Sequence, residues 1–152
     1  MSASERLAKM NVALPGVAAP VGSYVPAIKI GSLVMTSGQL PFRGGTLTCK
    51  GKVPADVSLE EAQEGARYAA LNALAAAAQA AGGIDRIARI VRVAVFVASS
   101  PGFCDQPKVA NGASDFLVEV FGEAGRHVRA AVGAAELPLG AAVEVELTVE
   151  IA

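Results

Sequence analysis

A long alanine-rich segment constrains the fold of this chain more than any other feature. It begins at Ser58-Leu-Glu-Glu61, where a serine followed three residues later by a glutamate forms a capping box at a helix start. It stops at Gly82-Gly83, where glycine supplies the left-handed conformation of a helix C-cap. The alanines between bury little apolar area each, but they let a helix backbone lie close to a sheet. The segment therefore predicts a helix from about 58 to 81 that packs against β-structure.

Segments on both sides of this helix are β-prone. Residues 24–30 and 33–39 flank Gly31-Ser32, a two-residue connection typical of a tight hairpin. From Ile87 to Ala98 the β-branched sequence becomes apolar on both alternating faces after Arg92, which predicts a strand buried on both sides.

The C-terminal third adds a helix and two strands. Residues 108–121 predict a second helix, although Gly112 interrupts it at a cost of about 1 kcal/mol relative to alanine. Residues 128–135 and 142–151 are strands separated by a turn that contains proline and glycine. Apolar and polar residues alternate strictly along the last strand, so its apolar face should meet the helices.

The predicted order is β-β-α-β-α-β-β, an α+β domain over residues 22–152 with a mixed sheet and both helices on one face. A chain of 152 residues fits a single domain. Residues 1–21 contain two prolines and a glycine and are expected to form an irregular lead-in. The other sheet face mixes apolar and charged residues, and oligomerisation would cover it.

Composition excludes several classes of protein. No run approaches the roughly 18 to 20 apolar residues that cross a bilayer, and the N-terminus lacks a secretory signal, so a cytoplasmic protein is expected. A net charge of −1 and 5% aromatic residues make nucleic acid an unfavoured partner. Cys49 and Cys104 match no metal or redox spacing and are expected to be free thiols.

Arg129 is the most promising binding residue. Alternation places it on one strand face with Ala131 and Gly133, where its guanidinium has room to hold a carboxylate through two parallel hydrogen bonds. An ion pair with a strand glutamate is the alternative, and alternation alone favours it. The single histidine, His127, cannot build a histidine-rich zinc site, and we expect it to be structural or solvent-facing.

An ordered set of short motifs resembles the reactive-intermediate deaminase (Rid, or YjgF-like) family. The set comprises Gly22-Ser-Tyr-Val25, Thr36-Ser-Gly-Gln39, Val53-Pro-Ala-Asp56, Asn111, Arg129 and Leu137-Pro138. The resemblance spans about Gly22 to the C-terminus. It implies a fold like that of trimeric chorismate mutase and a homotrimer with ligand sites in the clefts between subunits.

The resemblance also assigns roles to residues. Arg129 becomes the substrate-carboxylate clamp, and Glu144 positions or activates the attacking water. A register shift of two residues would give that role to Glu146. The matched pocket positions are Tyr24, Ser37, Gly38, Asn111 and, through a backbone contact, Ala131. From the residues alone, Glu144 is a solvated strand charge, Tyr24 and Ser37 are ordinary hairpin residues, and Asn111 caps a helix.

The family's deaminases hydrolyse short-lived enamines or imines, such as 2-aminoacrylate, to 2-keto acids and ammonia. The resemblance thus implies a hydrolase similar to 2-iminobutanoate/2-iminopropanoate deaminase, which needs no metal or cofactor because the imine is already electrophilic. A non-catalytic protein that senses a small carboxylate such as a keto acid is the alternative. Endoribonuclease activity, attributed to some relatives, ranks last because the chain lacks a basic patch and a histidine pair.

Three features depart from the family's pattern, the first of which is an unusual N-terminal extension. Ala131 stands where many Rid deaminases have cysteine, and residues 42–52 are longer than the usual link between hairpin and helix. These changes affect the expected pocket, so the identity of the carboxylate stays open.

Overall fold

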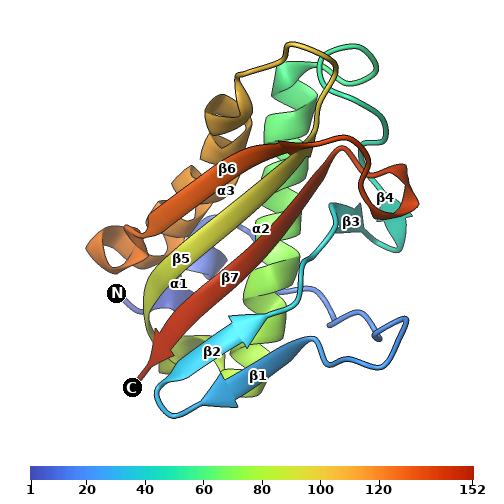
Figure 1. Ribbon diagram of the computed structural model, residues 1–152. Helices are drawn as coiled ribbons and strands as arrows, with labels where there is room; N and C mark the ends of the chain where they lie inside the picture. The colour runs from blue at the N-terminus through green and yellow to red at the C-terminus, as the bar shows by residue number, and fades with distance from the viewer.

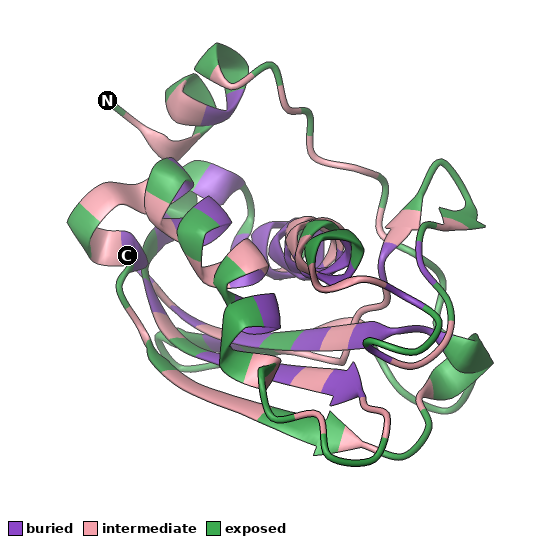
Figure 2. Cartoon of the chain, turned by 90° about the horizontal axis from the view of Figure 1, so that it is seen from above, coloured by how far each residue is buried: buried purple, intermediate pink, exposed green.

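A computed structural model describes all residues, 1–152, and shows helices packed on one face of a five-stranded sheet (Figures 1 and 2). The strands, in spatial order, are β1 (Ala27–Ile30), β2 (Leu33–Thr36), β7 (Val143–Ile151), β5 (Ile87–Ala98) and β6 (Val128–Ala134). Strands β5 and β6 pair in parallel and all other neighbours pair antiparallel. The α+β prediction with a mixed sheet is confirmed.

The alanine-rich helix α2 (Leu59–Ala81) packs against β7 and matches its predicted bounds. The Ser58 hydroxyl accepts from the Glu61 N–H at 3.1 Å, and the Glu61 carboxylate accepts in return from the Ser58 N–H. Gly82 ends the helix at a φ of 88°, the left-handed region that favours glycine. Most alanines of α2 are buried, and their small side chains let the helix approach the sheet.

Helix α3 (Gln106–Phe121) begins two residues earlier than predicted and crosses α2 closely. A Cβ at Gly112 would collide with the backbone carbonyl of Gln63. Gly112 is therefore required at the crossing of the two helices, and its low helix propensity is offset by the contact that it permits.

The strand patterns are confirmed for β7 and partly wrong for β5. Every apolar residue of β7 faces the helices and is buried. In β5, burial on both faces holds from Val93 to Ala98 except at half-buried Phe96, whereas Arg89 and Arg92 are exposed. The helices cover only one face of the sheet, so Arg92, which lies on the other face in register with Thr148, turns its side chain to solvent.

The expectation of an irregular segment over residues 1–21 is wrong in part. Residues Ala3–Lys9 form helix α1, which begins with a second capping box between Ser2 and Glu5. Leu7 is buried against the core, and the Ser4 hydroxyl donates to Asp85 at 2.6 Å. The Ser-x-x-Glu spacing is visible in the sequence, but seven residues stay helical only because α1 docks on the domain.

Residues 42–52, which were expected only to be a longer connection between hairpin and helix, contain regular structure. Strands β3 (Phe42–Arg43) and β4 (Thr46–Leu47) form a small hairpin, and the side-chain amide of Asn72 on α2 donates to the carbonyls of Leu40 and Phe42. The first hairpin is shorter than predicted, since its strands stop at Ala27 and Thr36. Short 3-10 turns complete the chain at Ile84–Arg86, Gly122–Gly125 and Pro138–Gly140.

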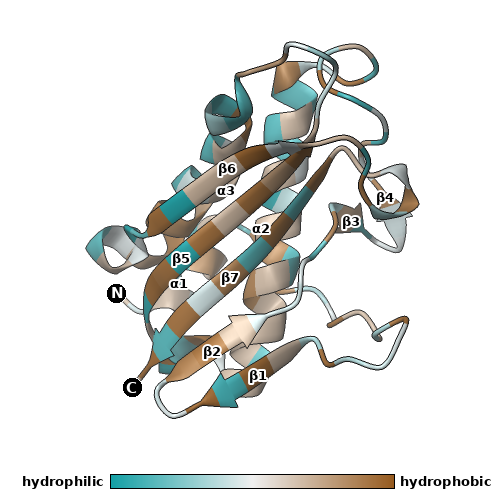
Figure 3. Ribbon diagram, in the orientation of Figure 1, coloured by the Kyte–Doolittle hydropathy of each residue, from teal (hydrophilic) through white to brown (hydrophobic).

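The sheet face away from the helices, here called the open face, carries exposed apolar residues; Figure 3 colours each residue of the strands by its hydropathy, with apolar residues in brown. They come from both edges of the sheet and are Ile28, Ile30, Leu33, Met35, Val128 and Val132. The acidic residues of β7 lie between these edges. No helix in the structure combines the length and apolar character needed to cross a membrane.

Candidate functional site

Arg129 lies on the helix side of edge strand β6. On β5 it lies in register with Val93, a residue of the core. The Arg129 guanidinium reaches α3. Nη1 donates to Asn111 Oδ1 at 2.8 Å and to Ser114 Oγ at 3.2 Å. The spacing i, i+3 on a helix places both acceptors on one face.

The guanidinium has no acidic partner. None of the four ion pairs in the structure includes Arg129, so the alternative of an ion pair with a strand glutamate is wrong for the isolated chain. Nη2 and Nε make no hydrogen bond and remain free. Ala131 follows on the same strand face and packs against the core. We define Arg129, Asn111, Ser114 and Ala131 as the arginine half-site.

Glu144 occupies the open face of β7, in register with Phe96 of β5. It is half-buried and has neither a hydrogen-bond nor an ion-pair partner. Burial, with a smaller contribution from Glu146, raises the pKa of the Glu144 carboxyl group. The carboxylate lies directly over Gly38, where any Cβ would collide with it.

The TSGQ motif shapes the backbone beneath Glu144. The Thr36 hydroxyl accepts from the Leu147 N–H at 3.0 Å, and Gln39 pairs with Val145. Between these anchors, the Ser37 hydroxyl donates to the Val25 carbonyl at 2.6 Å. This bond holds the segment that follows half-exposed Tyr24. We define Tyr24, Ser37, Gly38 and Glu144 as the glutamate half-site.

The two half-sites do not meet within one chain. Glu144 lies on the open face of β7, Arg129 lies on the helix side of β6, and β5 separates the two strands. Glu146 is exposed and is not the residue that covers Gly38, so the geometry favours Glu144 over Glu146 for the predicted water-handling role. Asn111 lies inside α3 and is not a helix cap, which corrects that alternative.

Sequence reasoning missed Ser114, and it expected His127 to be structural or solvent-facing without naming its contacts. His127 is half-buried, with Nε2 2.9 Å from Ser114 Oγ and Nδ1 2.7 Å from the Gly125 carbonyl oxygen. Two signals were available. Ser114 follows Asn111 at helical spacing, and His127 precedes Arg129 by two residues, the spacing of one strand face.

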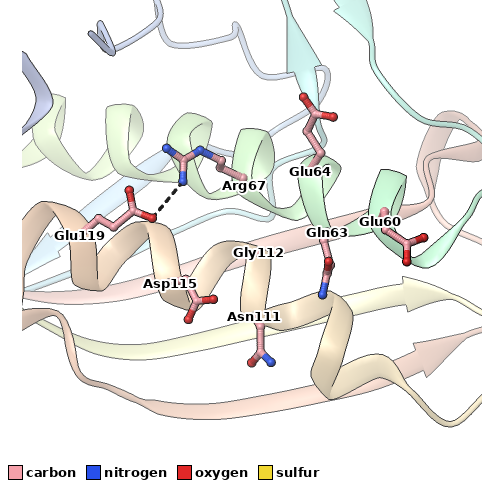
Figure 4. Close-up of a pocket in the computed structure, with 8 residues that line it drawn as sticks. All are labelled: Glu60, Gln63, Glu64, Arg67, Asn111, Gly112, Asp115 and Glu119. Carbon is pink, nitrogen blue, oxygen red and sulfur yellow. Dashed lines mark hydrogen bonds and ion pairs between the residues drawn. The ribbon is translucent and has the colours of Figure 1, made fainter. Parts of the chain in front are cut away.

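A polar groove of about 360 Å³ lies between α2 and α3, next to the arginine half-site (Figure 4). Arg67 and Glu119 form an ion pair across it at 3.4 Å. Its other charged residues are all acidic, namely Glu60, Glu64 and Asp115. This charge opposes a carboxylate ligand, so the groove is not the expected site.

Comparisons with known proteins agree with the fold. A family model described as "YjgF/chorismate_mutase-like, putative endoribonuclease" matches residues 4–151. Protein TCP17 of Trypanosoma cruzi is 46% identical over 148 residues, 95% of this chain and 91% of its own length. The 2-iminobutanoate/2-iminopropanoate deaminase of Escherichia coli K12 is 30% identical over 87 residues, 57% of this chain and 59% of its own length.

Solved structures are similar over nearly the whole chain. A Shewanella oneidensis MR-1 protein described as a "putative endoribonuclease" superposes with a TM-score of 0.95 at 38% identity, covering 99% of this chain and 100% of that one. Escherichia coli TdcF with bound serine has a TM-score of 0.64 at 28% identity, and the match covers 90% of this chain and 94% of TdcF. By the family model and these similarities, the chain belongs to the YjgF, or Rid-like, family, as its ordered motifs predicted.

Proposed function

We propose that this protein hydrolyses reactive enamines or imines of the 2-aminoacrylate type to 2-keto acids and ammonia. The observation that carries the proposal is a guanidinium held at one end by Asn111, with Nε and Nη2 free and no acidic partner. That arrangement suits bidentate binding of a carboxylate. A deaminase of this substrate class among the relatives, and a structural relative with bound serine, which also carries a carboxylate, support it.

In the proposed reaction, Arg129 binds the carboxylate and fixes the C=N group next to Glu144. Glu144 accepts a proton from water as the water oxygen bonds to the imine carbon. It then returns this proton to nitrogen, which gives a carbinolamine. In a second transfer Glu144 takes the proton of the carbinolamine hydroxyl and delivers it to the amino nitrogen, so that the C–N bond breaks, ammonia leaves and the keto group forms. A carboxyl group whose pKa is raised by burial suits both proton transfers.

The site also requires a second copy of the chain, because one chain keeps the two half-sites apart. We therefore propose a homotrimer in which the arginine half-site of one subunit faces the glutamate half-site of the next. The apolar side chains of the open face support this assembly, since oligomerisation would remove them from water.

The test measures keto-acid formation from 2-aminoacrylate that a serine dehydratase generates in situ. Wild type should accelerate this step, and Arg129→Ala and Glu144→Gln should each reduce the acceleration by about a hundredfold or more. Glu150→Gln, on the same face of β7, is the matched control and should keep activity. No acceleration by wild type would overturn the proposal.

Binding of 2-ketobutyrate separates catalysis from sensing. If wild type binds 2-ketobutyrate through Arg129 but never accelerates imine hydrolysis, the protein is a carboxylate sensor. The acidic groove beside the half-site gives no support to endoribonuclease activity, because RNA phosphates would be repelled there.

A further inference from the structure

A chain of hydrogen bonds lies behind Arg129 and is built from residues that the proposed reaction does not use. Ser114 Oγ lies 3.2 Å from Arg129 Nη1 and 2.9 Å from His127 Nε2. On the far side of the imidazole, Nδ1 lies 2.7 Å from the carbonyl oxygen of Gly125. The chain therefore runs from the backbone through His127 and Ser114 to the guanidinium.

The chemistry of the partners fixes the direction of each bond. A carbonyl oxygen only accepts, so His127 Nδ1 must carry a hydrogen. Burial lowers the pKa of His127 below its ordinary value of 6.5 despite the opposing hydrogen bond to Gly125, and the charge of Arg129 adds to this effect, so the neutral ring is favoured at pH 7. Nε2 then carries a lone pair and no hydrogen, so it can only accept a hydrogen bond. The Ser114 hydroxyl therefore donates to His127, and its oxygen is left to accept from Arg129.

This arrangement occupies one end of the guanidinium completely. Nη1 carries two hydrogens, and the acceptors that they meet are Asn111 Oδ1 at 2.8 Å and Ser114 Oγ at 3.2 Å. The hydrogens of Nε and Nη2 lie on the adjacent edge of the planar group and are free. Two parallel bonds to a carboxylate can form along that edge without disturbing the bonds to α3.

We propose that Ser114 and His127 are positioning residues that hold the Arg129 guanidinium, so that a carboxylate ligand binds to its Nε and Nη2 edge. Neither residue touches the ligand. The inference rests on the proposed function, in which Arg129 binds the substrate carboxylate. His127 sets the direction of the Ser114 hydroxyl, and Ser114 and Asn111 together prevent rotation of the guanidinium.

The first test is a double-mutant cycle on the affinity for 2-ketobutyrate. Ser114→Ala should raise the Kd about tenfold, because it removes a hydrogen bond to a charged group, whereas Ser114→Thr keeps the hydroxyl and should stay close to wild type. In the Arg129→Ala background, Ser114→Ala should change nothing further. His127→Phe should behave like Ser114→Ala. An equal effect of Ser114→Ala in both backgrounds would overturn the proposal.

Gln63→Ala provides the matched control. The Gln63 side chain also donates to α3, to the Lys108 carbonyl at 2.7 Å, but has no contact with Arg129. Its loss should leave the Kd for 2-ketobutyrate unchanged. A tenfold rise in the Kd of Gln63→Ala would show that any lost contact of α3, and not specifically the hydrogen bond to Arg129, lowers the affinity.

The second test needs no ligand and uses nitrogen-15 NMR of the wild type and Ser114→Ala. His127 should be the neutral Nδ1–H tautomer, and the Arg129 Nη1 hydrogens should exchange faster with solvent in Ser114→Ala. The Nε2–H tautomer, or unchanged Arg129 exchange, would overturn the positioning role. If wild type binds no 2-ketobutyrate, the carboxylate-binding function fails, and the NMR measurement still decides whether Ser114 holds Arg129.

Discussion

At the scale of single residues, Glu144 and Arg129 differ in whether they have hydrogen-bond partners within the chain. Arg129 is held at one end by neutral acceptors, whereas Glu144 is half-buried and has no partner in the chain. Burial of an unpaired carboxylate disfavours its charged form. The free edge of Arg129 and the raised pKa of Glu144 are both properties that a ligand or a neighbouring subunit could use.

The raised pKa makes a prediction about stability. Because the folded-state pKa lies above the ordinary value of 4.5, the contribution of Glu144 to stability is fully present below pH 4.5 and is lost as pH rises through the folded-state pKa. In the monomer, where no Arg129 of a neighbouring subunit faces this carboxylate, Glu144→Gln should therefore raise the Tm at pH 7, with a difference from the unsubstituted monomer that shrinks toward pH 4. Thermal denaturation across this range checks it, with Glu150→Gln as control. A lower Tm at pH 7 would reveal a favourable partner for the ionised carboxylate.

A methyl group at Gly38 tests the geometry of the glutamate half-site. Gly38→Ala should displace the Glu144 carboxylate, which any Cβ there would meet, and reduce imine hydrolysis by about a hundredfold. Gly16→Ala is the control, because nothing lies near the position of its Cβ. Keto-acid formation is the measurement, with circular dichroism to confirm folding. Full activity of Gly38→Ala would remove Glu144 from the proposed site.

At the scale of secondary structure, small residues set the spacing between layers. Buried alanines let α2 lie on the sheet, and Gly112 lets α3 cross α2. These contacts position Asn111 and Ser114 above Arg129. The arginine half-site therefore depends on how closely the two helices approach.

Gly112→Ala tests this dependence. Alanine has the higher helix propensity by about 1 kcal/mol, but its methyl group would collide with the Gln63 carbonyl. We expect a net loss of about 1 to 3 kcal/mol in the free energy of unfolding, measured by urea denaturation. A stabilised Gly112→Ala protein would contradict the close crossing.

The elements that local sequence controls were predictable. The capping box at Ser58 and the glycines after residue 81 fixed both ends of α2, and strict alternation assigned the faces of β7. Helix α1 was missed because its stability comes from docking of Leu7. The contact of Ser114 with His127 depends on where α3 crosses the end of β6, which no local pattern reports.

At the scale of the whole molecule, the proposed homotrimer would account for both the exposed open face and the separated half-sites. Assembly would cover the apolar edges of the sheet and bring Arg129 to the Glu144 of another subunit. The family resemblance named the residues of both half-sites except Ser114. It could not show that the half-sites lie apart within one chain, because that follows from the strand order β7-β5-β6 and from the pairing register that turns Arg129 and Glu144 to opposite faces.

A charge on the open face should prevent assembly. Val132 is 47% exposed in the isolated chain, and Val132→Glu would place a carboxylate in the proposed interface. We expect a trimer for wild type and monomers for the variant, measured by analytical ultracentrifugation, with loss of imine hydrolysis. Val132→Thr, similar in shape and uncharged, should remain assembled. A trimeric Val132→Glu protein would place the interface elsewhere.

The most direct test of a site shared between subunits mixes two inactive variants. Arg129→Ala lacks the arginine half-site and Glu144→Gln lacks the glutamate half-site, so each should be inactive alone. After unfolding and refolding together in equal amounts, one site in each mixed trimer should contain both intact half-sites. Over all randomly assembled trimers this is roughly a quarter of the sites, and keto-acid formation should recover to about that fraction of wild type. Activity that stays at the level of the separate variants, with mixed trimers present, would contradict the shared site.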